Sequence, residues 1–290
     1  MKSLSLGRYA PFNSLVHRLD PRSKLLILVL MMVAVFYGYS SQVMTFVMGG
    51  ILLLIIFVML LVSRVSLRQL FSSLKALWIM IIILLLINVL VPPLGASRIA
   101  FSVGTYHIFW ESILQSAKII LRLVMMISLT LILTATTKPL DLTYALEWYM
   151  YPLKLIKFPT HEIAMTISIA LRFIPTLLDE TMRIMNAQAS RGVDFEHGKV
   201  KEKIKAILSL IVPLFMSAFQ RSEELANAME ARGYNPRAKR TRYRNLHWGG
   251  GDTFSLLLAT ILTAGVILTS VMNWNYVEMI FNITTWSVGL

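Results

Sequence analysis

Two segments of this chain end in the same arrangement of an arginine and a glycine, and their chemistry suits the binding of an acidic partner. They share the pattern N-A-x-x-[SA]-R-G and begin 41 residues apart, at Asn186 and Asn227. A glycine at this position can adopt the left-handed conformation that ends a helix. The preceding arginine then lies at the carbonyl end of the helix, where a cation is favoured, and its guanidinium can bind a carboxylate bidentately. The candidate residues are Ser190, Arg191 and Gly192 in the first copy and Ala231, Arg232 and Gly233 in the second.

An arginine followed by a glycine also ends helices well without any partner. For a single copy, that structural interpretation is the simpler one. Two copies with the same flanking Asn-Ala favour two equivalent docking tips, and a pair of related subunits would supply two equivalent binding sites. We therefore predict that the two tips bind partners of the same kind.

The sequence predicts no catalytic residue, no cofactor and no metal site. Residues 192–199 superficially resemble a phosphate-binding loop, but five residues separate the two glycines instead of four, and no hydroxyl follows the lysine to hold magnesium. The H-E-x-x-H and G-x-S-x-G motifs are absent, cysteine is absent, and the five histidines have no ligand spacing. A membrane-anchored enzyme is therefore the weaker interpretation.

The composition is that of an integral membrane protein. Hydrophobic residues make up 56% of the 290 residues and charged residues 15%, against about 45–50% and about 25% in soluble domains. The mean hydropathy is +0.67. Five apolar stretches approach or exceed the ~20 residues that cross a bilayer. The sequence thus predicts an all-α membrane protein with about five transmembrane helices, at residues 25–39, 43–62, 76–91, 112–136 and 253–272.

The net charge of +13 is explained by topology. Residues 1–24, 63–75 and 138–250 carry 25 of the 28 basic residues. Because basic loops stay in the cytoplasm, we expect the N-terminus and residues 138–250 to be cytoplasmic and the C-terminus to lie outside. The lipid bilayer is therefore a partner, and nucleic acid is not needed to explain the charge.

The chain is predicted to have three parts. A leader and four transmembrane helices occupy residues 1–137, a cytoplasmic module occupies 138–250, and the last transmembrane helix with an extracellular tail occupies 251–290. The middle part is too long to be a simple connector. It has the periodicity of three amphipathic helices, which begin near Asp141, after Thr160 as an N-cap, and near Ile204.

The second and third of these helices are long and each contains a proline, Pro175 or Pro213, which should bend the helix near its middle. Their apolar faces fit either a protein partner or an interface with anionic lipid.

Charged residues near or within the spans have simpler explanations. Asp20 suits the N-cap of the first span, and Pro21 suits its first position. Arg22 and Lys24 would anchor the inner interface. In the fourth span, Lys118 and Arg122 form a possible intramembrane polar site. Lys118 would reach the outer surface and Arg122 would pair with backbone carbonyls, with an ion or substrate path as the alternative.

Together these segments resemble the transmembrane T component of energy-coupling factor transporters, the EcfT/CbiQ family. The resemblance covers nearly the whole chain, and one departure from the usual pattern is Ser190 in place of alanine. It includes Gly7-Arg8-Tyr9, Leu19-Asp20-Pro21-Arg22, Thr136-Thr137 with Pro139, Leu171-Arg172-Phe173-Ile174-Pro175 and the two terminal tripeptides.

The resemblance implies a non-catalytic coupling subunit in a bacterial cell membrane. Such a subunit joins a membrane-embedded, substrate-binding S component to two cytoplasmic ABC-type ATPase subunits, and the complex takes up vitamins or other micronutrients. By this resemblance, Arg191 would insert into a groove of one ATPase and Arg232 into a groove of the other. The alternative, a self-sufficient secondary transporter, would need inverted repeats and ionisable groups at mid-membrane.

Overall fold

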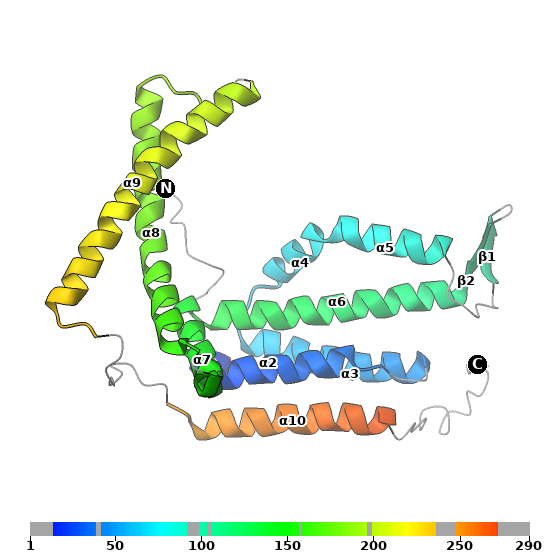
Figure 1. Ribbon diagram of the computed structural model, residues 1–290. Helices are drawn as coiled ribbons and strands as arrows, with labels where there is room; N and C mark the ends of the chain where they lie inside the picture. Colours follow the sequence, from blue (N-terminus) through cyan, green and yellow to red (C-terminus); the bar gives the residue numbers. More distant parts are fainter. Residues whose placement is uncertain are drawn as a thin grey trace. The chain divides into compact units, whose positions relative to one another are not determined.

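The computed structural model describes residues 14–38, 42–91, 99–103, 106–156, 158–195, 199–235 and 247–271. These residues are almost entirely helical (Figure 1), which confirms the predicted all-α membrane fold. The chain separates into two compact units. One consists mainly of residues 139–245 and is called the amphipathic module here; the other consists of residues 7–138 and 246–290 and is called the bundle.

The bundle is built around α6 (Trp110–Thr136), which packs against α2, α3, α4 and α5, while α10 packs against α2 (Figure 1). Its interior is apolar, with Met31, Ile56 and Leu60 almost fully buried. Large apolar side chains also cover its outer faces, as expected where lipid replaces water. The other helices of the bundle are α1 (Leu15–Arg18), α2 (Pro21–Phe36), α3 (Gln42–Val62), α4 (Leu67–Ala76), α5 (Trp78–Leu90) and α10 (Gly250–Val271).

Among the described residues, four helices are long and apolar enough to cross a membrane, or five if one bent pair counts as a span. Three of them, α3, α6 and α10, correspond to predicted spans. The first predicted span corresponds to α2, which has 16 residues and is about 24 Å long. The fourth long helix is the 31-residue α8, which the sequence analysis assigned to the cytoplasmic module; it is the least apolar of the four.

The third predicted span, residues 76–91, corresponds to α5, and the shorter helix α4 precedes it at an angle. The axes of α4 and α5 differ by 55°. The break falls at Leu77, whose N–H turns back to the carbonyl of Leu74 at 3.0 Å. Pro92 and Pro93, which follow this span and would end its helix, lie outside the described residues, as does Gly7-Arg8-Tyr9.

The start of α2 confirms the predicted cap. The Asp20 side chain accepts a hydrogen bond from the N–H of Arg22 at 2.8 Å, and Pro21 is the first helical residue. Lys24 differs from the prediction of an interface anchor. It is 7% exposed, and its Nζ donates to the carbonyls of His17 (3.3 Å) and Thr136 (3.1 Å).

In the amphipathic module, α8 packs against α7 on one side and against α9 on another, and α8 and α9 cross (Figure 1). Glu147 on α7 lies 3.2 Å from His161 at the start of α8. Thr160 is not the N-cap that the sequence suggested. It is the first residue of α8, and the cap position belongs to Pro159, which offers no side-chain acceptor. The elements are α7 (Pro139–Met150), the 3-10 helix η1 (Tyr151–Ile156), α8 (Thr160–Ser190) and α9 (Val200–Ala231).

Both interior prolines lie within continuous helices, Pro175 in α8 and Pro213 in α9. A proline inside a helix removes one backbone hydrogen bond and favours a bend. The bends at Pro175 and Pro213 stay a prediction.

A short antiparallel hairpin precedes α6. Its strands are β1 (Ile99–Val103) and β2 (Tyr106–Phe109), with Ile99 opposite Phe109. The sequence analysis assigned no helix or strand to this segment. The strands have only five and four residues, at the short end of the range over which alternation indicates a strand.

Candidate docking site at the helix ends

The end of α8 is closed by a complete Schellman motif. Gly192 has a φ of +86°. Its N–H donates to the carbonyl of Ala189 at 2.9 Å, and the N–H of Val193 donates to the carbonyl of Gln188 at 3.1 Å. This pair of bonds satisfies carbonyls that the helix leaves without partners. Arg191 is the C-cap residue, so its side chain leaves the chain where the helix ends.

The end of α9 is closed in the same way, residue for residue. Gly233 has a φ of +73°. Its N–H donates to the carbonyl of Glu230 at 2.8 Å, and the N–H of Tyr234 donates to the carbonyl of Met229 at 2.9 Å. Arg232 is the C-cap residue. The repeated sequence pattern therefore builds one local structure twice.

The two ends also match in exposure. In each copy the Asn, the Ala, the small residue, the arginine and the glycine are exposed, while the third residue and the residue after the glycine are half-buried. The one chemical difference is small, because the Ser190 hydroxyl turns back to the carbonyl of Asn186 at 3.0 Å. Serine at this place therefore presents nearly the same surface as alanine.

The cap geometry alone does not make a docking site. The end of α3 closes with equivalent bonds, in which Arg64 takes the left-handed position with a φ of 53°. There the flanking Ser63 and Val65 are buried in the bundle. At the ends of α8 and α9 the residue before the arginine is exposed and the residue after the glycine is half-buried, so more of each tip is open to a partner.

Arg191 and Arg232 are the groups with binding capacity at these tips. Within the described parts of the chain, neither guanidinium forms an ion pair or a hydrogen bond to another side chain. Each can therefore offer its five N–H donors to an acidic groove. The helix carbonyls behind each arginine favour the same positive charge.

At the second candidate site, Lys118 and Arg122, the arginine contacts another helix. Arg122 Nη2 donates to the carbonyl of Tyr37 at 3.3 Å, the kind of backbone partner expected for it. Tyr37 is the C-cap of α2, so the guanidinium lies at the carbonyl end of that helix. Lys118 lies one turn away on α6 and is half-buried.

Sequence reasoning missed Asp252, which is 4% exposed at the start of α10. Its carboxylate accepts hydrogen bonds from the N–H of Asp20 at 2.6 Å, from the Ser23 hydroxyl at 2.7 Å and from the N–H of Gly249 at 2.8 Å. The available signal was an acidic residue three positions after a glycine at the start of a span, which is the N3 position of a capping box.

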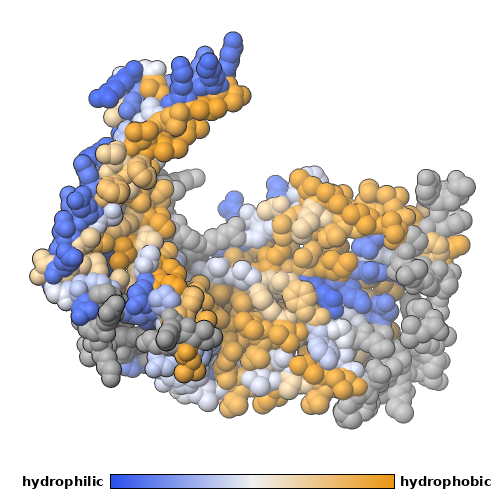
Figure 2. Space-filling view, in the orientation of Figure 1, coloured by the Kyte–Doolittle hydropathy of each residue, from blue (hydrophilic) through white to orange (hydrophobic). Residues whose placement is uncertain are grey.

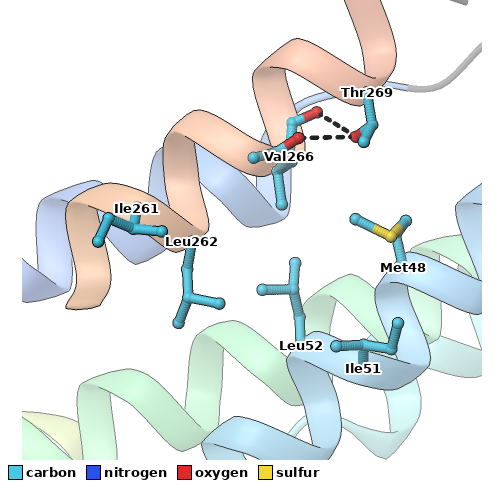
Figure 3. A pocket seen from close by; sticks show the side chains of 8 residues that line it. Met48, Ile51, Leu52, Ile261, Leu262, Val266 and Thr269 are labelled. Atoms are coloured by element: carbon cyan, nitrogen blue, oxygen red, sulfur yellow. Dashed lines mark hydrogen bonds between the residues drawn. The ribbon is translucent and has the colours of Figure 1, made fainter. Parts of the chain in front are cut away.

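A groove between α3 and α10 has a volume of about 180 Å³ (Figure 3). Apart from Gly265 and Thr269, it is lined by apolar side chains, including Met48, Leu52 and Leu262. The Thr269 hydroxyl is directed at carbonyls of its own helix, those of Gly265 and Val266. The groove therefore offers nothing to recognise a polar substrate.

Among the described residues, no group of three or more His, Asp or Glu side chains is placed to hold a metal ion.

These features define a multi-pass α-helical membrane protein that carries two equivalent cationic helix ends. The chain belongs to the CbiQ family, described as cobalt transport protein, whose family model matches residues 12–243.

Its relatives are named for one kind of transporter. The chain is 44% identical over 263 residues to the energy-coupling factor transporter transmembrane protein EcfT of Macrococcus caseolyticus (strain JCSC5402), covering 91% of this chain and 97% of that protein. It is 43% identical over 267 residues to the protein of the same name from Bacillus subtilis (strain 168), covering 92% and 98%. The family resemblance is thereby confirmed, and the chain is a transmembrane component of a transporter.

Proposed function

We propose that this chain is the coupling subunit of an energy-coupling factor importer that takes up a vitamin or another micronutrient. In this proposal two ABC-type ATPase subunits bind the ends of α8 and α9, and a membrane-embedded S component supplies the substrate site. The observation that carries the proposal is the pair of matching caps, each with an exposed arginine at a helix carbonyl end.

The charge of the tips favours an acidic partner. A guanidinium that enters a groove lined by carboxylates gains register and orientation as well as attraction. Arg191 would bind one ATPase and Arg232 the other. Because both ATPases would be of one kind, two equal tips are the simplest way to hold them.

The remaining surface of α8 and α9 suits the S component. An apolar band follows this pair of helices, with hydrophilic side chains along its other edge (Figure 2). Exposed side chains this large and this numerous indicate an interface with protein or lipid. They include Ile167, Ile174, Leu178 and Met182 on α8 and Ile204, Ile207, Leu208, Ile211, Phe215 and Phe219 on α9.

The distribution of basic residues supports a cytoplasmic position for residues 138–250 and for the N-terminus, with the C-terminus outside. The ATPases would then meet the tips on the side of the membrane where ATP is present. Closure of the ATPases on ATP would displace the tips, and α8 and α9 would carry the displacement to the S component. ATP hydrolysis in this scheme belongs to the partners.

The test is retention of the ATPases by charge-reversed tips. An Arg191→Glu/Arg232→Glu variant should remain in the membrane fraction but lose both ATPases on purification. Losing one partner of a buried charge pair commonly costs ~2–5 kcal/mol, and reversal adds repulsion. Arg172→Glu, an exposed position within α8, is the matched control and should retain both ATPases. Normal recovery of both ATPases with the double variant would refute docking through these arginines.

A further inference from the structure

The helices of the amphipathic module follow those of the bundle after α6, and the chain returns to the bundle before α10. Thr136 is the last residue of α6, and Asp252 lies in the first turn of α10. Two adjacent residues of α2, Ser23 and Lys24, form hydrogen bonds with these two residues. The Ser23 hydroxyl lies 2.7 Å from Asp252 Oδ1, and Lys24 Nζ lies 3.1 Å from the carbonyl of Thr136.

These contacts are deeply buried. The exposed fractions are 0% for Ser23, 4% for Asp252 and 3% for Thr136. A hydrogen bond in such surroundings is stronger than one exposed to water, and a partner left without it is costly. The contacts therefore form a stiff connection and do not exchange freely with solvent.

The cluster joins three helices through opposite helix ends. Lys24 places a cation at the carbonyl end of α6, and Asp252 places an anion at the amino ends of both α2 and α10, because the N–H groups of Asp20 and Gly249 donate to it. Each charge is favoured by the helix end that it meets. We call Ser23, Lys24, Thr136 and Asp252 the root cluster.

We infer that the root cluster is the point through which movement of the module is transmitted into the bundle. This inference rests on the proposed coupling function. If the two chain connections were free, the module could move under the ATPases while the bundle stayed still. Because the end of α6 and the start of α10 are both hydrogen-bonded to α2, a displacement that reaches either helix displaces α2, α6 and α10 together. Ser23 and Lys24 are then positioning residues for coupling.

The experiment compares transport with ATP use in one preparation. The chain is purified with both ATPases and with an S component of known vitamin specificity, and the complex is reconstituted in proteoliposomes. Uptake of that radiolabelled vitamin and release of phosphate are measured together. Lys24→Met keeps the length of the side chain but removes its donors. We expect this variant to retain the ATPases and hydrolyse ATP while it moves severalfold fewer vitamin molecules per ATP.

Two further variants separate coupling from folding. Lys75→Met makes the same change at an exposed position of α4 and should keep the wild-type ratio. Lys24→Arg retains donors and should recover most of the ratio. If Lys24→Met does not assemble, Ser23→Ala decides, because it removes only one hydroxyl, which lies 2.7 Å from Asp252 Oδ1 and 2.8 Å from the carbonyl of Asp20.

A wild-type ratio of uptake to hydrolysis in whichever of Lys24→Met and Ser23→Ala assembles would overturn the inference. Failure of the proposed function would appear earlier and differently, because the unaltered chain would then fail to retain the ATPases.

Discussion

At the scale of single residues, the two arginines and the two glycines have different tasks. The arginine supplies charge, and the glycine supplies a backbone conformation that places the arginine at the helix end. Gly192 and Gly233 both have positive φ, which costs roughly 1–2 kcal/mol for a residue with a Cβ. No atom would clash with an added Cβ at either position, so the cost of substitution comes from the backbone alone.

Gly233→Ala should therefore loosen the last turn of α9 while leaving Arg232 in place. We expect faster amide exchange over residues 229–234 and weaker retention of one ATPase, by a free energy of about 1–2 kcal/mol. Hydrogen exchange measured by mass spectrometry, with a pull-down, checks both. Gly50→Ala in α3 is the control, since an added Cβ there also meets open space, within a helix. Wild-type exchange and retention in Gly233→Ala would contradict this role.

The residues that the sequence predicted well are those whose structure is local. A glycine after an arginine ends a helix through contacts within six residues, and Asp20 caps α2 through a bond to Arg22 two positions later. Asp252 escaped prediction because its partner Ser23 is 229 positions away in the sequence. Thr160 failed as an N-cap because helix α8 begins one residue earlier than the pattern suggested.

At the scale of elements, α2 and α6 are antiparallel, and a cation bonds α2 to α6 near each end of α2. Lys24 of α2 caps the carbonyl end of α6, and Arg122 of α6 caps the carbonyl end of α2 through Tyr37. A cation at the last carbonyls of a helix satisfies acceptors that would otherwise lack partners. This explains how α6 carries a charge at membrane depth without an acidic partner.

Arg122→Met should destabilise the bundle without changing the tips of α8 and α9. Hydrogen bonds from charged donors contribute about 1.5–3 kcal/mol, so we expect the variant to unfold at a lower temperature. The midpoint of thermal unfolding is measured in detergent, with size-exclusion chromatography as the readout. Arg68→Met, at an exposed position of α4, should leave the midpoint unchanged. An unchanged midpoint for Arg122→Met would instead favour the alternative that this arginine serves an ion or substrate path.

The elements also show where a hydropathy pattern stops being informative. Apolarity predicted α3, α6 and α10 because length and composition alone identify such helices. It did not reveal α4 as a separate helix, because α4 is short and far less apolar than α5. Nor does average hydropathy alone separate α8 from a span, because a long helix with one apolar face can still have an apolar average. The amphipathic periodicity is what assigned this helix to the cytoplasmic module.

At the scale of the whole molecule, the chain combines an apolar bundle with a module whose described residues expose two cationic tips and an apolar band. None of these features performs chemistry, but together they suit a subunit that converts movement of its partners into movement of another. The absence of cysteine from the sequence makes this testable, since an introduced cysteine is the only thiol in the chain.

The most direct measurement is photo-crosslinking from a single cysteine beside each tip. Ala187→Cys and Ala228→Cys are exposed and occupy equivalent positions in the two copies of the pattern. Each is labelled with a benzophenone reagent, and the complex is irradiated in native membranes, with Thr260→Cys on α10 as the control. We expect the labelled cysteines at both tips to crosslink to ATPase polypeptides and the control cysteine not to do so. Tips that crosslink only to lipid, or that react with a membrane-impermeant thiol reagent from outside the cell, would contradict it.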